Sequence, residues 1–323
     1  MNQDTQAQTN DGHTSEEDVI AQIDNFDELP DAPPKRRIKL SWIGKLSVAM
    51  VVMWLVIAAI GPELLAPFHE MDIDGDDSFM DAHSNDYGTF YLGTDYLGRD
   101  TLSRLIYGAR NTIGISLAAT LLAYMLGITA GILAAVKGGW IDMVISRFND
   151  AILALPSIML GLIVIAALGS SKGNLIGIAA VIYASSVFRI ARALGQDIMV
   201  QDFVEAAKAR GEGVWWIIKS EILPNAAMPL ATDFGLRLVF VVLFVASMSF
   251  LGLGVPLPES DWGSMVRENL PGLTAGIDVD YNDVVSLAPI WPALAIATFT
   301  IPINLIVDDI SAKSGGSLAK KMV

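Results

Sequence analysis

The sequence predicts an all-α membrane protein whose chain crosses the bilayer six times. Of its 323 residues, 53% are hydrophobic and only 17% are charged, whereas about a quarter of the residues in soluble domains are charged. The apolar residues also stand in long uncharged runs, such as the 26 residues between Arg110 and Lys137 and the 21 residues between Asp150 and Lys172. A helix needs about 20 mostly apolar residues to cross the hydrocarbon of a membrane, so each of these runs is long enough for one crossing.

The first four spans follow from where the uncharged runs begin and end. The first is expected at residues 41–68, around the uncharged stretch 46–60. The second and third fill the two runs named above. The fourth covers residues 174–188 and ends at Arg189. The first and fourth have short uncharged cores, but a terminal Lys or Arg can lengthen such a span because its charged end reaches the membrane surface.

The last two spans complete the predicted set. The fifth begins near Asn225 and continues to Pro258, and the sixth covers residues 284–307. Asp233 and Arg237 lie near the start of the fifth span, four residues apart, so they would share one face of a helix. Charged residues within a membrane are candidates for function. A pair of opposite sign is equally consistent with a structural ion pair, and both interpretations stay open.

The distribution of basic residues predicts which side of the membrane each connection occupies. Six crossings place both termini on the same side. Lys and Arg are concentrated before the first span, between the second and third, between the fourth and fifth, and after the sixth, and such an excess marks the cytoplasmic side. Residues 1–40 and 311–323 are therefore predicted to be cytoplasmic tails, and the loop at 199–224 is predicted to be cytoplasmic. Residues 69–110 and 259–283 are predicted to face outward.

Two acidic stretches are expected to be solvated and flexible. Residues 1–34 carry nine acidic residues and no Lys or Arg, and residues 63–95 carry nine more, again with no base. Such composition is typical of solvated chain, although an adaptation to an acidic or saline habitat and the docking of a partner remain alternatives. Three basic residues on the outer side depart from the cytoplasmic rule. The three bases are Arg99, Arg104 and Arg110, and Asp95 and Asp100 are the acids expected to pair with them.

Several kinds of chemistry are excluded by what the sequence lacks. The chain has no cysteine, which excludes disulfides, thiolate metal sites and cysteine nucleophiles. Its three histidines, His13, His69 and His83, lie outside the predicted spans, so no histidine metal site is expected inside the membrane. No Gly-x-x-x-x-Gly-Lys-Ser/Thr sequence occurs, so the chain is not expected to bind ATP by itself. No enzyme, metal or cofactor site is predicted.

The connection at residues 199–224 carries the most informative motif. Asp202 is a suitable N-cap, and Glu205 stands three positions later, as in a capping box. The alanines that follow Glu205 favour a helix with a shallow surface, and Gly211 can take the left-handed conformation that closes a helix. A second amphipathic helix is expected to follow and to end at Pro224, before the fifth span. The chain therefore places a short Ala-rich helix at the cytoplasmic face.

This motif resembles the EAA signature of ABC importer permeases. Its Glu-Ala-Ala at residues 205–207 is followed after three residues by Gly211, and Leu223-Pro224 follows after eleven more. The ending at residues 222–225 is similar to that of the dipeptide, oligopeptide and nickel permease branch. Three further blocks are similar to the same branch and follow in the expected order. They are residues 92–100 with 103–104 and 107–110, residues 138–139 with Asp142, Arg147 and Asp150, and residues 249–254 with Trp262-Gly263.

The resemblance implies the fold of a type I ABC importer permease, with a five-helix core at residues 111–310. It implies that the motif forms a coupling helix, which seats in an ATPase subunit. Two ATPase subunits would bind ATP and Mg, a second homologous permease would complete a heterodimer, and an extracytoplasmic binding protein would deliver the substrate. Such systems lie in the bacterial cytoplasmic (inner) membrane, and nucleic acid is not among their partners. The residues assigned to coupling are Glu205, Ala206, Ala207, Gly211, Leu223 and Pro224.

The resemblance also implies that the chain forms half of a pathway that opens alternately to each side of the membrane. Short peptides are the first substrate expected, with nickel chelates, opines and other small solutes as alternatives. A self-contained secondary transporter is the rival class. It would predict inverted repeats and charged residues near mid-membrane, and the sequence shows neither convincingly. The residues assigned to the pathway or its outer gate are Ser249, Phe250, Gly252, Gly254 and Trp262, with Asp233 and Arg237 as further candidates.

Overall fold

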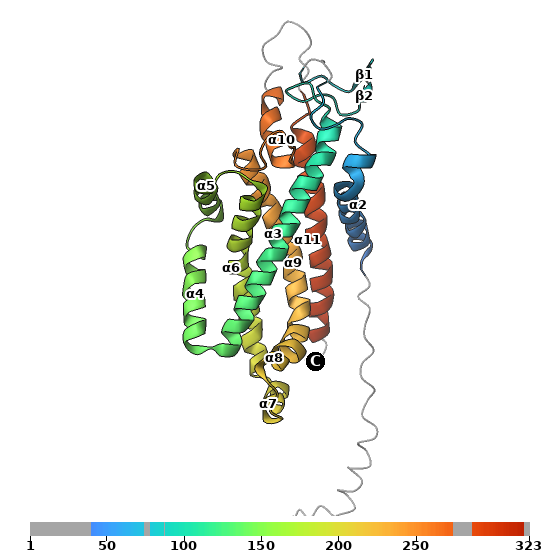
Figure 1. Ribbon diagram of the computed structural model, residues 1–323. Coiled ribbons are helices and arrows are strands. Elements are labelled where there is room, and N and C mark those ends of the chain that lie inside the picture. The colour runs from blue at the N-terminus through green and yellow to red at the C-terminus, as the bar shows by residue number, and fades with distance from the viewer. Residues whose placement is uncertain (1–39, 74–77, 87, 274–285, 320–323) are drawn as a thin grey trace, which may run out of the picture. The chain divides into compact units, whose positions relative to one another are not determined.

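The computed structural model describes residues 40–73, 78–86, 88–273 and 286–319. The predicted N-terminal tail lies outside these residues, apart from Leu40. The described chain is mostly helical, as predicted, with one two-stranded hairpin (Figure 1). Its elements are α2 (Trp42–Leu64), β1 (His83–Asn85), β2 (Gly88–Phe90), α3 (Thr101–Lys137), α4 (Gly139–Leu153), α5 (Ser157–Leu168), α6 (Lys172–Met199), α7 (Asp202–Ala209), α8 (Val214–Ile217), the π turn η2 (Ile218–Ile222), α9 (Leu223–Phe250), α10 (Trp262–Asn269), the 3₁₀ turn η3 (Leu270–Leu273) and α11 (Ile290–Ala319).

Among the described residues, five helices are long and apolar enough to cross a membrane. They are α2, α3, α6, α11 and the continuous helical stretch Val214–Phe250. α4 and α5 pass the same test only together, and they meet at an angle of 89°. The structure therefore agrees with six crossings when this bent pair counts as one. The sequence did not place the bend, which lies where Pro156 disfavours the helical conformation of the residue before it.

Two helices extend beyond the uncharged runs that predicted them. α3 begins at Thr101, ten residues before the predicted start of the second span, because Asp100 caps it. The Asp100 carboxylate accepts a hydrogen bond of 2.7 Å from the backbone N–H of Ser103, which satisfies one of the free donors at a helix start. α6 likewise continues past Arg189 as far as Met199.

The fifth span differs from its prediction at both ends. Pro224 does not end a separate helix, because the chain stays helical throughout Val214–Phe250. The π turn η2 directly precedes Pro224, which stands in the first turn of α9. A proline has no N–H to donate to a preceding carbonyl, and the π turn marks the place where the regular hydrogen-bond pattern of this continuous helix changes. At the other end, α9 stops at Phe250 and does not reach the predicted Pro258.

α3 and α6 pack closely at Gly127 and Gly131, two glycines that stand four residues apart on α3. A Cβ atom built on Gly127 would lie 2.7 Å from the Cβ of Val187, and one on Gly131 would lie 2.8 Å from the Cβ of Ala191. Both distances are shorter than real Cβ contacts. Small residues at such positions let helix backbones approach within a membrane, so these two glycines set the separation of α3 and α6.

Residues 78–86 and 88–100 form a folded segment at one end of α3. The strands β1 and β2 pair in antiparallel register, and the backbone N–H of Phe79 donates to the carbonyl of Asp95 at 3.0 Å. Figure 1 shows β1, β2 and α10 near one end of α3, and α7 near the other end. The described residues of this part of the acidic stretch are therefore folded and are not the flexible chain that their composition predicted, although most of residues 78–86 are exposed to solvent.

Candidate functional site

The predicted coupling helix is present as α7, Asp202–Ala209. Its N-cap is Gln201, which makes no side-chain capping bond, so the prediction that Asp202 is the cap is wrong by one residue. Asp202 and Glu205 both lie in the first turn of α7. Negative charge is favourable there because the first N–H groups of a helix carry partial positive charge. The two acids therefore support the helix start without the predicted capping box.

The end of α7 is closed as the sequence predicted. Gly211 has a φ of +83°, a left-handed conformation that glycine adopts without a Cβ penalty. Its N–H donates to the carbonyl of Lys208 at 2.9 Å, and the N–H of Glu212 donates to the carbonyl of Ala207 at 3.1 Å. This pair of bonds is the Schellman arrangement that terminates many helices. α7 is thus a short helix with a fixed end.

One face of α7 is buried in its own chain. Val204 and Ala207 are fully buried, in a cluster with Ile132 of α3 and with Ile217 and Ile222 from the stretch that leads into α9. The resemblance assigned Ala207 to contact with an ATPase. The structure turns Ala207 into this buried cluster, so this residue helps to fix α7 to the rest of the chain.

The opposite face of α7 is open. Glu205 and Ala206 are exposed, and the ring of Phe203 is 42% exposed. Leu223 and Pro224, at the start of α9, are exposed as well. The predicted coupling residues therefore divide into an inward group that holds the helix and an outward group that can meet another protein. The outward face combines a small residue, a carboxylate and an aromatic ring.

Asp233 and Arg237 form the ion pair that their spacing predicted. Arg237 Nη2 lies 3.2 Å from Asp233 Oδ1, and the two side chains are 20% and 11% exposed, respectively. The hydroxyl of Tyr124 also donates to Asp233 Oδ2 at 2.5 Å. The carboxylate is thus balanced within the chain and joins α9 to α3, which matches the structural interpretation of the pair.

The outer block at residues 249–254 forms a tight turn after α9. Ser249 is buried, whereas Phe250 is 39% exposed. Gly252 reverses the chain with a φ of +85°. Gly254 lies so close to Ser249 that a Cβ atom would overlap its backbone and hydroxyl. The glycines of this block are therefore required by the turn itself.

Trp262 anchors α10 to the membrane helices. Its indole is fully buried, and Nε1 donates to the carbonyl of Leu105 at 3.0 Å. Its backbone N–H donates to Thr112 Oγ1 at 3.0 Å. The ring meets Trp54 edge-on at a centroid distance of 4.9 Å and Phe299 at 6.3 Å. Trp262 is therefore an anchor in the core and does not face an open passage.

α9 presents an exposed apolar face along the membrane. Phe240 is 50% exposed and Leu243 is 43% exposed. Two hollows open on this face, one bordered by α10 and α11 and the other by α5 and α6. Leu243 and Ser247 line both hollows. The face therefore offers a mostly apolar surface with a hydroxyl group, continuous from Phe240 to Phe250.

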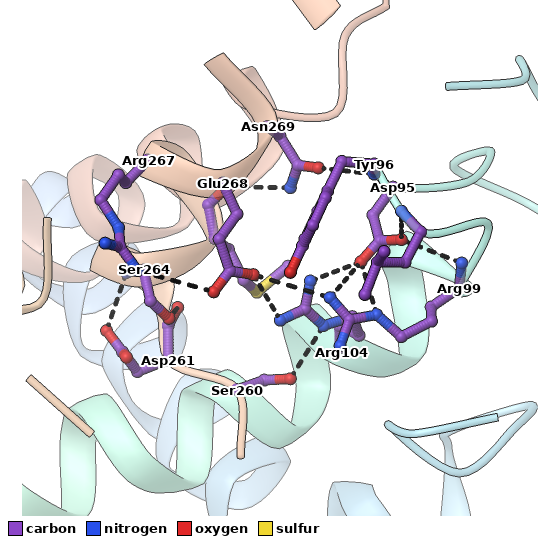
Figure 2. Close-up of polar contacts among 12 residues, drawn as sticks. Asp95, Tyr96, Arg99, Arg104, Ser260, Asp261, Ser264, Arg267, Glu268 and Asn269 are labelled. Carbon is purple, nitrogen blue, oxygen red and sulfur yellow. Dashed lines mark hydrogen bonds and ion pairs between the residues drawn. The ribbon is translucent and has the colours of Figure 1, made fainter. Parts of the chain in front are cut away.

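A buried ionic cluster that the sequence only partly predicted lies at the outer end of α3 (Figure 2). Asp95 and Arg104 have side chains with no exposed surface, and they meet at 2.5 Å. Arg99 lies 2.8 Å from the same carboxylate, and Glu268 of α10 lies 3.0 Å from Arg104. The pairing of Asp95 with both arginines is confirmed. Glu268 was missed because it stands 164 residues from Arg104.

Asp100 and Arg110, the other two residues predicted to form ion pairs here, make different contacts from those predicted. Asp100 was expected to pair with an arginine, but its carboxylate caps α3. Arg110 pairs with Glu63 of α2 at 2.6 Å. The sequence did carry one signal for the cluster, because Arg99 and Arg104 are basic residues on the predicted outer side, where such residues are depleted.

Asp261, directly before α10, is a residue whose environment changes its ionisation. Burial raises the pKa of its carboxyl above the ordinary value, because a charged group loses its hydration there. Oδ1 accepts hydrogen bonds from the N–H groups of Gly263 and Ser264 at 3.0 and 3.1 Å, so Asp261 is the N-cap of α10. Within the residues that the structure describes, no group of three His, Asp or Glu is arranged to hold a metal ion.

The packed apolar spans define a multi-pass membrane protein. Residues 127–312, more than half of the chain, match the model of the family described as "Binding-protein-dependent transport system inner membrane component". The chain belongs to this family of permeases of the bacterial inner membrane. The family's description names a binding protein as the component on which such systems depend.

Curated relatives of the chain are permeases that are named for the transport of peptides. It is 28% identical to the glutathione transport system permease protein GsiD of Pectobacterium atrosepticum, over 81% of this chain and 83% of the relative. It is 33% identical to the dipeptide transport system permease protein DppC of Alkalihalophilus pseudofirmus, over 68% of this chain and 69% of the relative.

A solved structure shows the same fold. The chain is similar to one in the inward-facing MetNI methionine ABC transporter, with a TM-score of 0.51 and 18% identity, over 65% of this chain and 96% of that chain. The predicted fold of an ABC importer permease is confirmed.

Proposed function

We propose that the chain is the permease subunit of an ATP-driven importer of short peptides. The names of its relatives, which include dipeptide and glutathione permeases, support this substrate class. Two separate ATPase subunits would bind ATP and Mg and hydrolyse ATP, and this chain would hold no cofactor. A second, homologous permease would complete the pathway, and an extracytoplasmic binding protein would deliver the peptide.

The two-faced packing of α7 is the observation that carries this proposal. Val204 and Ala207 are fully buried against the chain itself, whereas Glu205 and Ala206 are exposed. A helix that is fixed on one face and open on the other fits a partner's groove, where helix-in-groove recognition uses the exposed side chains. Force applied to the open face would then pass to α3 through the buried face.

The exposed face of α9 is the proposed half of the pathway. It lies on the same helix as the Ser249 turn and extends over Phe240, Leu243 and Ser247. Its apolar side chains and hydroxyl group would contact peptides of varied sequence without selecting one charge. Rigid helix groups would rock between inward-open and outward-open states, with α7 and both termini in the cytoplasm.

The docking face is tested by changing one exposed alanine. Ala206→Asp leaves the buried face of α7 intact, so we expect normal insertion and folding. A charged group in the partner's groove should reduce ATPase binding at least tenfold and peptide uptake in proportion. The measurements are co-purification of the ATPases and uptake of labelled dipeptide into proteoliposomes that contain the complete transporter.

Lys219→Asp is the control for a charge change outside α7, because Lys219 is exposed on η2 and the substitution reverses its charge. We expect it to assemble and transport normally. Wild-type ATPase binding and uptake by Ala206→Asp would contradict the docking role of α7. Saturable ATP binding by the isolated chain would contradict the division of labour, and uptake of nickel chelates in place of peptides would contradict the substrate class.

A further inference from the structure

Arg104 joins three separate parts of the chain at the outer end of α3. Its side chain has no exposed surface. Nε donates to Ser260 Oγ at 3.0 Å, Nη1 donates to Asp95 at 2.5 Å, and Nη2 donates to Glu268 Oε2 at 3.0 Å. Figure 2 shows this guanidinium between the three partners. A planar guanidinium presents its donors in fixed directions. The bonds to Glu268 of α10 and to Ser260 just before it hold α10 against α3, and the bond to Asp95 adds the segment that leads into α3.

The carboxylate on the other side of Arg104 is itself held rigidly. Asp95 Oδ1 accepts from the backbone N–H groups of Leu97 and Arg99 at 2.8 and 2.9 Å. Asp95 Oδ2 accepts from Arg99 Nε at 2.9 Å as well as from Arg104. With Glu268, the cluster contains two arginines and two carboxylates, so its formal charges balance. Well-packed apolar residues often stabilise a fold as well as buried ion pairs do, so stability alone does not account for the cluster.

The segment before α10 is fastened to α3 by further polar contacts. Asn111 Nδ2 donates to the carbonyl of Ser260 at 2.7 Å, and Trp262 bonds to both Leu105 and Thr112. The backbone N–H of Ser260 donates to the buried Glu70 carboxylate at 2.8 Å. These contacts follow α3 over about two turns beyond Arg104, so α10 is attached along a line and not at a single point.

α3 also reaches the predicted coupling helix. It is one helix of 37 residues, which corresponds to about 55 Å at 1.5 Å per residue. Near its inner end, Ile132 belongs to the buried cluster that holds Val204 and Ala207 of α7, and Val136 packs against the same cluster. One unbroken helix thus shares a buried cluster with α7 at one end and contacts α10 at the other.

We propose that Arg104 is a positioning residue for transport, which clamps α10 to α3 so that both move as one body. Displacement of α7 would then reach Trp262 and the outer block through α3. This inference rests on the proposed function, because the motion it transmits is the one that ATPase docking would cause. The directed bonds to Ser260, Asp95 and Glu268, and not the charge alone, would carry the clamp.

The test separates the bonds from the charge balance in the complete transporter. Arg104→Met alone leaves the cluster with an excess negative charge. The main variant is therefore the double substitution Arg104→Met/Glu268→Leu, which removes one charge of each sign. Arg104→Lys keeps the charge but loses the fork of donors. Lys172→Gln is the matched control, since Lys172 and Glu259 form an exposed pair at 40% and 42% exposure, outside the cluster.

Two measurements are made on each variant. Cysteines at Leu121 on α3 and Leu270 in η3 are placed in the chain, which has no native cysteine, and pulsed EPR gives the distance between two spin labels. Peptide uptake per ATP hydrolysed is measured in proteoliposomes. In the wild type and in Lys172→Gln, we expect one narrow distance that is the same without nucleotide and in the ATP-trapped state.

In the double variant, we expect normal assembly, a distance distribution at least twice as wide and uptake per ATP lowered at least fivefold, with intermediate values for Arg104→Lys. A wild-type distance that changes between the two states would overturn the proposal, as would a double variant with a narrow distance and normal uptake. If the double variant does not assemble, normal uptake per ATP by Arg104→Lys would overturn it, and reduced uptake with a widened distance would support it. Failure of the wild type to take up peptides would count against the proposed function alone, because the nucleotide-free distances still report on the clamp.

Discussion

Gly254 illustrates how closely the outer turn is built at the level of one residue. A Cβ atom at this position would overlap the backbone of Ser249, which cannot move away as a flexible side chain can. We expect Gly254→Ala to lower the free energy of unfolding by about 1–3 kcal/mol, the usual range for overpacking. The measurement is thermal unfolding in detergent, followed by tryptophan fluorescence.

Gly177 provides the matched control for this prediction. A Cβ atom there meets nothing within 4 Å, and Gly177 lies inside α6. Ala favours a helix over Gly by up to about 1 kcal/mol, so Gly177→Ala should leave the stability unchanged or raise it. Equal melting temperatures for the Gly254 and Gly177 variants would show that the turn tolerates a side chain.

Asp261 predicts a dependence of stability on pH. Burial raises the pKa of its carboxyl in the folded chain, so the folded state binds this proton more tightly than the unfolded state does. The group therefore favours folding at low pH, and its contribution is lost as the pH rises through the folded-state pKa. Asp261→Asn keeps an N-cap acceptor but does not titrate.

The Asn variant should melt at a higher temperature than the wild type, by an amount that grows as the pH rises above about 4, the ordinary value for Asp. The measurement is Tm against pH for both chains. If the difference in Tm between the two chains did not change with pH, burial would not raise the pKa of Asp261.

Sequence reasoning located the helix of the predicted coupling motif but not the directions in which its residues face. The closing role of Gly211 was predictable, because a left-handed residue after a helix favours glycine. Ala206 and Ala207 look alike in the sequence, yet only Ala207 is buried. Which alanine faces inward depends on Ile132 of α3, far along the chain. Local pattern cannot supply that contact.

At the scale of single elements, α2 contains a proline that another helix compensates. Pro62 lies inside α2 and has no N–H to donate to the carbonyl four residues earlier. That carbonyl, on Ala58, accepts a hydrogen bond of 3.1 Å from Arg110 Nε of α3. Arg110 therefore replaces the bond that Pro62 cannot make.

A double-mutant cycle tests this compensation. In Pro62→Ala, the new N–H can bond to Ala58, so Arg110→Gln should destabilise this variant less than it destabilises the wild type. The expected coupling is about 1 kcal/mol, the net value of one hydrogen bond. It is read from unfolding of the four chains in mixed detergent micelles. Additive effects within about 0.3 kcal/mol would indicate independent residues.

The spans themselves were largely predictable, because long uncharged runs have few alternatives in a membrane. The bend between α4 and α5 was not, although Pro156 marks it, since prolines also occur in continuous membrane helices. Pro302 does so inside α11. The difference between a break and a tolerated proline depends on how neighbouring helices satisfy the backbone, which the sequence alone does not show.

Over the whole molecule, the cluster around Arg104 lay beyond sequence reasoning for a different reason. The two arginines stood out as basic residues on the outer side, and the nearby Asp95 was a natural partner. Glu268 and Ser260 come from another part of the chain, and only the path of α10 brings them together. Charge patterning could therefore indicate that a site exists but not which elements it joins.

The orientation of the whole chain gives the last prediction. The distribution of Lys and Arg places α7 in the cytoplasm and α10 outside, and the structure puts these elements at opposite ends of α3 (Figure 1). Single cysteines at Lys208 and Arg267, both accessible in the structure, can be introduced into the cysteine-free chain. An impermeant maleimide added to intact cells should label position 267 and leave position 208 unlabelled until the membrane is opened. A cysteine at Val204, which is fully buried, should stay unreactive from both sides and so control for exposure. Labelling of position 208 from outside would reverse the orientation, and with it the assignment of α7 to the ATPase side.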